Sequence, residues 1–341
     1  MATWLRKALG IGLTVIAGAT LHAQINRSVI VRVNGEQLFH VDIEAEAGNL
    51  ARDYIRSASG LSDATADDGK RLMAALFPSA VIRVVEQLLI AQRGRAMGLK
   101  APESGFPTAI EQMMTAMGAR TREELDKALA REGGSIDDVR RVWERSTLLD
   151  LTLRSQVRGN DPKAFEAFMQ PLRSAARLEW QRDDLRQAFE ARGFAPVTGA
   201  LLASNEALAV STLRQVVSAQ LAYASTCTSL QYAASFENLT RAAGNMVPFM
   251  DPELKPAGTR MTRGGYAFTL VPEGPVTQTN ACNGAGPVAA GFTVFAAPVT
   301  PDATGIRHFA TSEAGTIYQN FGGPISSVRG SVKPASARPI S

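Results

Sequence analysis

The spacing of apolar and polar positions predicts a long central helix in the first half of the chain. Between Leu72 and Lys100 the polar residues fall near one stripe at helical spacing, and apolar residues cover the remaining faces. Pro78 is expected in the first turn of this helix, and Gly98 is expected to end it. A helix with so much apolar surface must be wrapped by other elements.

Shorter periodic segments flank this helix. The β-branched run Ser28–Val33 ends at Asn34-Gly35, which is a signal for a two-residue hairpin turn. Amphipathic helices with capping residues are predicted at residues 42–57, 108–117, 122–131 and 135–157. Residues 176–180 alternate as a half-buried strand does, and the acidic pair Asp183-Asp184 suits the start of a further helix.

The second half has the pattern of one long helix followed by strands. Residues 205–224 keep a helical period. Strands are predicted at residues 266–271 and 292–297, and in a hairpin at residues 307–311 and 316–319. The glycines at positions 264–265 and 284–286 are expected in loops. A long helix on an antiparallel sheet is therefore expected.

Charge density separates the two halves. Residues 24–192 contain 25 basic and 25 acidic residues, and residues 193–341 contain 9 basic and 7 acidic residues. A chain of 341 residues is long enough for about two domains. The predicted organisation is a signal peptide at 1–23, a helical core at 24–192, a linker at 193–204, an α+β domain at 205–320 and a disordered tail at 321–341.

The N-terminus has the features of an export signal. Arg6 and Lys7 precede an apolar run that ends in Leu21-His22-Ala23, a small-residue cleavage site. The run is too short to span a bilayer, and no later segment is expected to span one. We therefore expect a periplasmic or otherwise exported protein, which stays anchored if the signal is uncleaved. The net charge of +4 falls to +2 without Arg6 and Lys7, so nucleic acid is not expected as a partner.

Cys227 and Cys282 are the two cysteines of the chain, and both lie in the second half. In an oxidising compartment a single disulfide between them is the simplest hypothesis. The histidines are His22, His40 and His308, and none has a spacing to the cysteines that suits zinc. A metal site is therefore not expected.

Three sequence segments of the first half point to a known family: VIVRVNGEQLFHVDIE, VVEQLLIAQRGRAMGLKAPE and TREELDKALAREGGSIDDVRRVWERSTLLDLTLRSQV. Their order over Ser28–Val157 resembles the N-terminal domain of the SurA family of periplasmic chaperones. Residues 164–189 resemble the piece that closes the same core, whose strand pairs with the first strand. The family usually carries parvulin prolyl-isomerase domains between these parts, and here only the short stretch from Arg158 to Pro162 fills that place. The resemblance thus implies a chaperone core without isomerase activity.

The second half contains four further sequence segments: NEALAVSTLRQVVSAQLAYAST, DPEL, GGYAFTL and FTVFAAPVTPDATGIRHFATSEAGTIYQN. Over Asn205–Asn320 they resemble the globular head of type IV pilins and type II secretion pseudopilins. The apolar assembly helix of pilins has no counterpart after Gly193-Phe194, so the resemblance implies a role in protein contact and not filament assembly by the usual route. The fold class expected is therefore multidomain, a mainly α SurA-like chaperone core followed by an α+β pilin-like domain.

A protein that binds unfolded polypeptides needs a groove lined by deformable apolar side chains. The candidates for this groove are Met73, Phe106, Met113, Met114 and Met117. Methionines at helical spacing also suit gap filling in a core.

No Walker loop, Gly-x-Ser-x-Gly, HExxH or strand-linked GxGxxG motif is present in the sequence, so no catalytic residue or cofactor is expected. For His40 and His308 we expect surface or packing roles.

The sequence therefore favours a non-enzymatic, exported, chaperone-like protein that binds unfolded or exported polypeptides. The alternative is a structural or secretion-apparatus component whose pilin-like head docks on a folded envelope protein. A third hypothesis, an unrecognised isomerase activity, has no catalytic constellation behind it. The first two hypotheses differ in what is bound, a denatured client or a folded partner.

Overall fold

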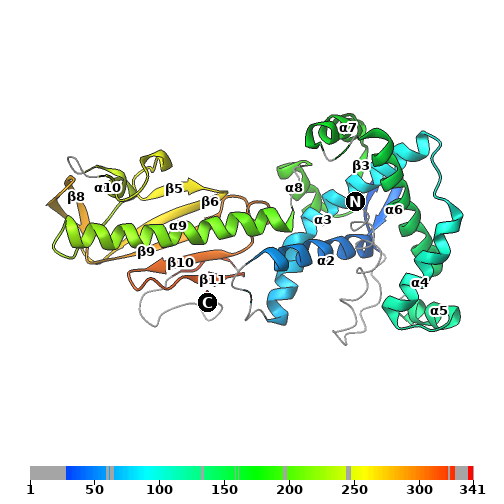
Figure 1. Cartoon of the computed structure of the whole chain (residues 1–341), viewed down its shortest axis with the longest axis horizontal. Helices are drawn as coiled ribbons and strands as arrows, with labels where there is room; N and C mark the ends of the chain where they lie inside the picture. The colour runs from blue at the N-terminus through cyan, green and yellow to red at the C-terminus, as the bar shows by residue number, and fades with distance from the viewer. Residues whose placement is uncertain are drawn as a thin grey trace. The chain divides into compact units, whose positions relative to one another are not determined.

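The computed structural model of the chain describes residues 28–58, 61, 65–131, 134–157, 159, 161–194, 198–242, 247–321, 323–326 and 337–340. The predicted signal peptide at 1–23 lies outside these residues. Helices and antiparallel sheets form two compact units (Figure 1). The first unit contains residues 28–51 and 76–194, and the second contains residues 52–75 and 198–340. Residues 52–75, which were predicted to belong to the helical core, are thus grouped with the second unit.

A small antiparallel sheet with the order β2-β1-β3 lies in the first unit. β1 (Val29–Val33) and β2 (Glu36–Phe39) are joined by Asn34 and Gly35, which have φ angles of 53° and 87°. Positive φ at both central residues is what a type I′ hairpin turn requires, so the predicted turn is confirmed. β3 (Leu178–Trp180) pairs with the other side of β1, with Val31 opposite Trp180.

The helices of the first unit follow the predicted pattern with one marked difference. α3 (Ala66–Ala96) begins well before Pro78, which lies inside the helix and not in its first turn. Thr65 and Asp68 explain the earlier start, because their side chains bond reciprocally to the backbone N–H groups of each other as a capping box. The other helices are α2 (His40–Ser57), α4 (Phe106–Met117), α5 (Arg122–Arg131), α6 (Ile136–Gln156), α7 (Pro162–Ala175) and α8 (Asp183–Arg192).

α3 is long and apolar enough to cross a membrane by length and composition alone, contrary to the expectation that no segment after the signal would be. The core helix of a folded unit passes the same test. In α3, 56% of the most apolar window is buried within the fold. Its buried side chains include Val84, Val85 and Leu88, so a core role accounts for its composition.

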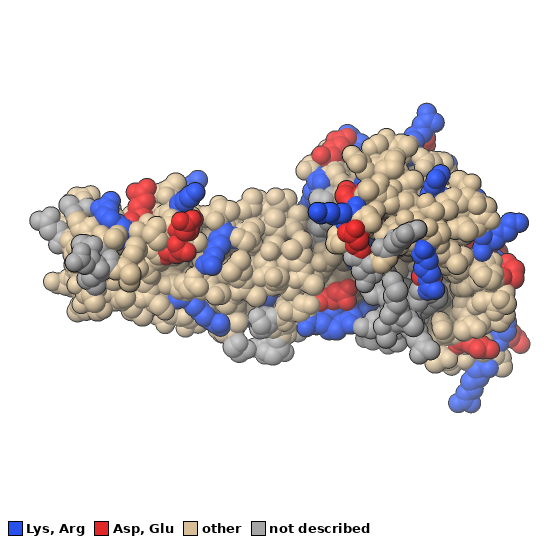
Figure 2. All heavy atoms as spheres, turned by 45° about the horizontal axis from the view of Figure 1, so that its top comes forward, with Lys and Arg blue, Asp and Glu red and all other residues tan. Residues whose placement is uncertain are grey.

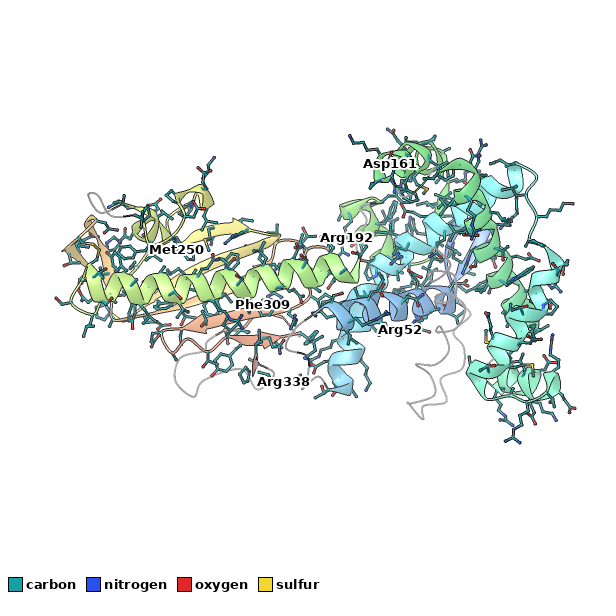
Figure 3. The ribbon with its side chains drawn as sticks, in the orientation of Figure 1. Arg52, Asp161, Arg192, Met250, Phe309 and Arg338 are labelled. Carbon is teal, nitrogen blue, oxygen red and sulfur yellow. A yellow bond between two sulfur atoms is a disulfide. The ribbon has the colours of Figure 1, made fainter. Side chains whose placement is uncertain are left out.

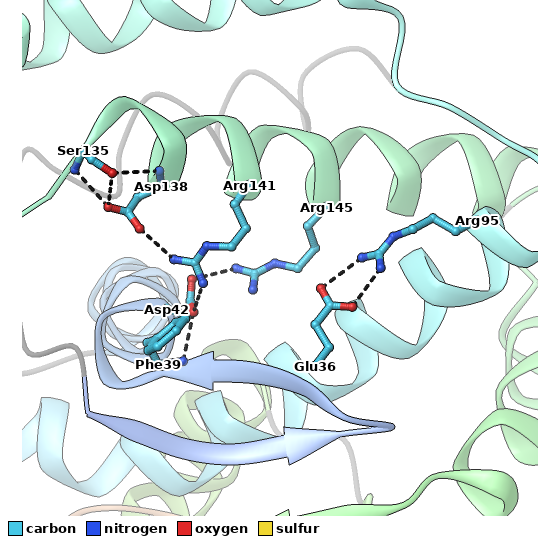
Figure 4. Close-up of polar contacts among 8 residues, drawn as sticks. All are labelled: Glu36, Phe39, Asp42, Arg95, Ser135, Asp138, Arg141 and Arg145. Atoms are coloured by element: carbon cyan, nitrogen blue, oxygen red, sulfur yellow. Dashed lines mark hydrogen bonds and ion pairs between the residues drawn. The ribbon is translucent and has the colours of Figure 1, made fainter.

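Charge pairs fasten α6 to β2 and α2 (Figure 4). Asp42 is nearly completely buried, and its carboxylate accepts hydrogen bonds from Arg141 at 3.3 Å, from Arg145 at 3.2 Å and from the backbone N–H of Phe39 at 3.0 Å. A buried carboxylate without such partners costs several kcal/mol. α6 is therefore held in register with the start of α2.

A second pair ties β2 to α3. The Arg95 guanidinium bonds both carboxylate oxygens of Glu36, at 2.8 and 3.0 Å (Figure 4). Burial raises the pKa of Glu36, but the hydrogen bonds from Arg95 and Gln92 outweigh it and hold this pKa below its ordinary value. This bidentate pair adds geometric specificity to the hairpin position.

The second unit is a long helix on an antiparallel sheet. α9 (Gly199–Thr226) lies along a six-stranded sheet whose order is β12-β11-β10-β9-β6-β5 (Figure 1). The strands are β5 (Arg260–Arg263), β6 (Tyr266–Glu273), β9 (Gly291–Pro298), β10 (His308–Ser312), β11 (Tyr318–Asn320) and β12 (Arg338–Pro339). Side chains that include Met250 and Phe309 fill the core of this unit (Figure 3). The Thr198 side chain caps α9 by accepting from the N–H of Leu201, so the helix includes residues 199–204 of the predicted linker.

A second, three-stranded sheet has the order β4-β8-β7. Its strands are β4 (Tyr232–Ala233), β7 (Thr277–Ala281) and β8 (Gly284–Ala289), and α10 (Phe236–Thr240) follows β4. The prediction that Gly284 and Gly286 are loop residues is wrong, because both lie in β8. A Cβ at Gly286 would stand 2.4 Å from the side-chain nitrogen of Asn238, so this strand position requires glycine for close packing.

The predicted disordered tail is also wrong for the part of it that the structure describes. β12 pairs with β11, with Tyr318 opposite Pro339. Ile325 and Ala337 are buried against Ala310 on the face of the sheet opposite to α9. Arg338, which Figure 3 labels, pairs with the buried carboxylate of Asp68 of α3. Burial of apolar side chains offsets the ordering of these residues.

The predicted disulfide between Cys227 and Cys282 is confirmed. Cys227 is the C-cap residue of α9, and Cys282 lies in the turn between β7 and β8. The bond fastens this hairpin to the end of the long helix.

Removal of the disulfide is expected to destabilise the second unit. The bond closes a loop of 55 residues, which corresponds to about 4 kcal/mol of unfolding free energy on the chain-entropy model. Urea unfolding of the wild type with and without dithiothreitol measures the effect. A variant with Cys227→Ser and Cys282→Ser should match the reduced wild type and be insensitive to the reductant. Equal stability of the oxidised and reduced proteins would contradict the prediction.

Candidate functional site

The candidate peptide-binding residues of the first unit lie on α4, within a small group of helices formed by α4, α5 and the start of α6. Gly118 ends α4 in the left-handed conformation, with φ of 67°, as a C-cap glycine does. The Thr121 hydroxyl accepts from the N–H of Glu124 and starts α5. Ser135 and Asp138 form a capping box at the start of α6. Local sequence signals therefore define all three helices.

An apolar cluster of its own holds these helices together. The rings of Phe106 and Trp143 lie with their centroids 5.2 Å apart, and Leu125 and Leu129 of α5 are buried beside them. The Arg140 guanidinium lies 4.0 Å from the centre of the Phe106 ring and pairs with Glu103. The sequence did not single out Trp143 or Arg140, although an aromatic residue at the inner face of a predicted helix was a usable signal.

Met113, Met114 and Met117 are half-buried at the border of this cluster. They continue the face of α4 that begins with buried Ala109 and Ile110, at spacings of three and four residues. Each side chain therefore contacts the cluster and retains an exposed part. An unbranched thioether side chain adapts its shape to its neighbours, which suits contact with varied apolar sequences.

Two of the five predicted residues have a different position. Phe106 is only 8% exposed, so its ring is part of the buried cluster and does not line a surface. Met73 is half-buried in the segment 52–75 that belongs to the second unit, and it is not a member of the α4 cluster. The structure thus places three of the five residues together on α4, and Phe106 belongs to the buried cluster that these methionines border. We call Met113, Met114 and Met117 the α4 methionine face.

The surroundings of the α4 methionine face carry mixed charge. On α5, Lys127 pairs with Glu123 at 2.7 Å, and Arg122 pairs with Asp126 at 3.3 Å. Basic and acidic residues are also interspersed on the side of the molecule that Figure 2 shows. No single sign of charge dominates, so apolar contact is the interaction that this face can offer.

The second unit contains a buried polar centre that the sequence did not predict. Glu206 of α9 is fully buried, and its carboxylate accepts from the Tyr54 hydroxyl at 2.5 Å and from the Arg307 Nε at 2.8 Å. The backbone N–H groups of Ile306 and Arg307 donate to it at 2.8 and 3.0 Å. Arg307 also donates to Gln319 of β11 at 2.7 Å. The Glu206 carboxylate of α9 therefore joins two other segments, α2 and residues 306–307, and Arg307 extends the network to β11.

Burial and charge perturb the tyrosines at this centre. Burial raises the pKa of Tyr54 well above its ordinary value, and the Glu206 carboxylate raises it further. Burial likewise raises the pKa of Tyr266, whose hydroxyl donates to the carbonyl oxygen of Arg307 at 2.8 Å. None of these side chains is open to solvent, so the centre serves to hold the fold and not to contact a substrate.

The structure describes His40 and His308, and neither is among the residues that form the α4 cluster or bond Glu206. His40 packs its ring on Phe77, with centroids 4.8 Å apart, and bonds Glu44. His308 is half-buried on β10, and burial lowers its pKa. Among the residues that the structure describes, no three acidic, histidine or cysteine side chains are grouped as metal ligands.

No protein-family model, no curated protein and no solved structure matches this chain. The resemblances to SurA chaperones and to pilin heads therefore stay predictions.

Truncation of the Phe106 ring in the α4 cluster should destabilise the first unit. Phe106→Ala is expected to lower the unfolding free energy by about 3–5 kcal/mol, as for other buried phenylalanines. Met113→Ala should cost less than half of that amount, because Met113 is already partly exposed. Urea unfolding monitored by tryptophan fluorescence, to which Trp143 and Trp180 of the first unit contribute, measures both variants. Equal effects would show that Phe106 does not organise the cluster.

The buried tyrosine should make the second unit labile to alkali. The pKa of Tyr54 is raised by folding, so above pH 10 the unfolded chain loses this proton first and the folded state loses stability as the pH rises. The expected slope is about 1.4 kcal/mol per pH unit for each such tyrosine. Tyr54→Phe should lower stability by about 1.5–3 kcal/mol at pH 8 through the lost bond to Glu206. The unfolding free energy of the Tyr54→Phe variant should also fall less steeply than that of the wild type between pH 10 and 11. A slope equal to that of the wild type would contradict this account.

Proposed function

We propose that this protein is an exported, non-catalytic chaperone-like protein that binds unfolded polypeptides at the α4 methionine face. The observation that carries the proposal is the set of three half-exposed methionines on one face of α4, which border the buried cluster that contains Phe106 and Trp143. Flexible apolar side chains on a firm support allow one surface to accept many sequences. Binding through such a face is expected to be promiscuous and of modest affinity.

The finer fold assignment is part of the same proposal. The first unit has a sheet in which β3 pairs with β1, and its long helix α3 is surrounded by shorter helices, which supports a SurA-like core. The second unit has a long helix along an antiparallel sheet and a disulfide near its end, which supports a pilin-like head. We assign the first unit the contact with unfolded clients.

The alternative proposal gives the main role to the second unit, which would dock on a folded envelope or secretion-apparatus protein. In that case the α4 methionine face would only complete the packing of the first unit. The two proposals predict different effects of substitutions on α4, so one experiment separates them.

Polar substitution of the α4 methionine face should abolish most client binding. A variant with Met113→Ser, Met114→Ser and Met117→Ser is expected to bind a permanently unfolded polypeptide, reduced and carboxymethylated α-lactalbumin, about tenfold more weakly or worse, a loss of about 1.4 kcal/mol or more. The physical reason is the loss of apolar area at the contact. Fluorescence anisotropy of the labelled client measures the affinity, and circular dichroism confirms the fold of the variant.

Two matched variants control this experiment. Replacement of the same residues by leucine keeps the apolar area and should retain most of the binding. Met97→Ser changes a half-buried methionine of the first unit outside α4 and should leave binding unchanged. Unchanged client binding by a folded triple serine variant would overturn the proposal and favour the alternative.

A further inference from the structure

The edges of the three sheets differ in how they are protected from pairing with another strand. An edge strand presents unpaired backbone N–H and C=O groups, and proteins usually block it with charge, proline, very short length or a covering group. The edge strands in the described part of the chain are β2, β3, β4, β5, β7 and β12. We compared them one by one.

The edges of the six-stranded sheet carry charge or proline. β5 contains Arg260 and Arg263, which would place like charges together if two copies of this strand were paired. β12 consists of Arg338 and Pro339 only, and proline has no N–H to donate. Both edges are therefore protected.

The edges of the first unit and β4 are protected in other ways. In β2 the N–H of Phe39 donates to the buried carboxylate of Asp42. β3 has three residues and contains Glu179. β4 has two residues, and the Gln220 side chain bonds both the N–H and the carbonyl oxygen of Ala233, at 2.9 and 2.8 Å. A glutamine amide thus takes the place of a neighbouring strand there.

β7 has none of the protecting features described for the other edge strands. Its sequence, Thr-Gln-Thr-Asn-Ala, contains no charged residue and no proline. Thr277 and Gln278 are exposed, and Val276 just before the strand is 50% exposed. A strand of five residues with β-branched threonines and an open side is a template for another strand.

The register of the hairpin shows which backbone groups of β7 are open. Ala281 lies opposite Gly284 across a two-residue turn, so this pair is hydrogen-bonded, and the bonded positions alternate from there. Gln278 lies opposite Pro287, which has no N–H, as a non-bonded position allows. The backbone groups of Gln278 and Asn280 therefore point away from β8, on the side where β7 is the last strand of its sheet.

The edge is also held in a fixed position. The turn after β7 contains Cys282, which is bonded to Cys227 at the end of α9. The Asn283 side chain in the same turn is buried and donates to the carbonyl oxygen of Asn238 at 2.6 Å. A partner that adds to β7 would not have to order it first, which lowers the cost of binding.

We propose that β7 is a self-association surface, on which the β7 strand of a second copy of this chain pairs in antiparallel orientation. A two-fold axis at Thr279 would place Gln278 of each copy opposite Asn280 of the other. Both residues have outward backbone groups, so four N–H···O bonds would join the two three-stranded sheets into one. A closed two-fold contact of this kind needs a surface that is complementary to itself.

Charge is the reason for a second copy as the occupant. A strand without charge brings no like-charge repulsion when it pairs with itself, whereas self-pairing of β5 would bring its arginines together. The outward groups of β7 are also arranged symmetrically about Thr279, so the same strand satisfies them all. The pairing goes beyond the proposed client binding, and it would place two α4 methionine faces in one particle.

Paired charge variants test this contact. A basic variant has Gln278→Lys and Asn280→Lys, and an acidic variant has Gln278→Glu and Asn280→Glu. Each alone is expected to self-associate about tenfold more weakly than the wild type, because like charges lie directly opposite across the two-fold axis. An equimolar mixture of the two should regain association as a one-to-one heterodimer. Sedimentation velocity over a concentration series measures all three samples.

Thr262→Lys on β5 is the matched control, since it adds charge at an exposed threonine of an edge strand that is already protected, and it should associate like the wild type. A wild type that stays monomeric at its highest soluble concentration would overturn the proposal. Charge variants that associate as the wild type does would overturn it too. If the wild type is monomeric but unfolded α-lactalbumin binds it in a manner abolished by both charge variants, the occupant is an extended client and the second-copy proposal is wrong.

Discussion

The carboxylate of Glu206 is the group on which the second unit depends most. It lies at 0% exposure in a helix packed on a sheet, where an isolated charge costs several kcal/mol. Its cost is offset because one guanidinium, one phenol and two backbone N–H groups donate to it. Burial lowers the pKa of Arg307, but the Glu206 carboxylate outweighs this effect and raises it, so the guanidinium stays charged. The ion pair therefore sets the relative positions of α9, the start of β10 and the end of α2.

This constraint explains why residues 52–75 belong to the second unit. Tyr54 supplies one donor to Glu206, and Asp68 pairs with Arg338 of β12. Leu72 adds a buried apolar side chain. A segment that precedes most of the first unit in sequence is thus required to satisfy a carboxylate and a guanidinium that come much later. α2 and α3 each begin in one unit and end in the other, so no single cut of the sequence separates the two.

The features that could be predicted from the sequence are those that depend on the chemistry of neighbouring residues. The Asn34-Gly35 turn and the bounds of α5 follow from residue preferences and capping, and the disulfide follows from a cysteine count of two. Long-range contacts decided the rest. In the sequence, Arg338 and Ala337 resemble part of a polar tail. Their order depends on β11, with which residues 338–339 pair, and on Ala310 of β10, against which Ala337 packs. Gly286 looks like a loop residue until Asn238 is known to lie against it. In the sequence, Tyr54 is one more apolar position on a helix. Its polar role depends on the hydrogen bond from its hydroxyl to Glu206.

The α4 methionine face shows the same division between local pattern and tertiary context. Helical spacing placed Met113, Met114 and Met117 on one side of α4, but it did not fix how much of each side chain would be covered. That depends on α5 and α6, whose Leu125 and Trp143 fill the space below. Full coverage would have left only packing as a role, and full exposure would have left a cluster prone to aggregation. Partial coverage retains apolar area for a partner while the ring of Phe106 keeps the helix in place, which is the combination that reversible binding of unfolded chains requires.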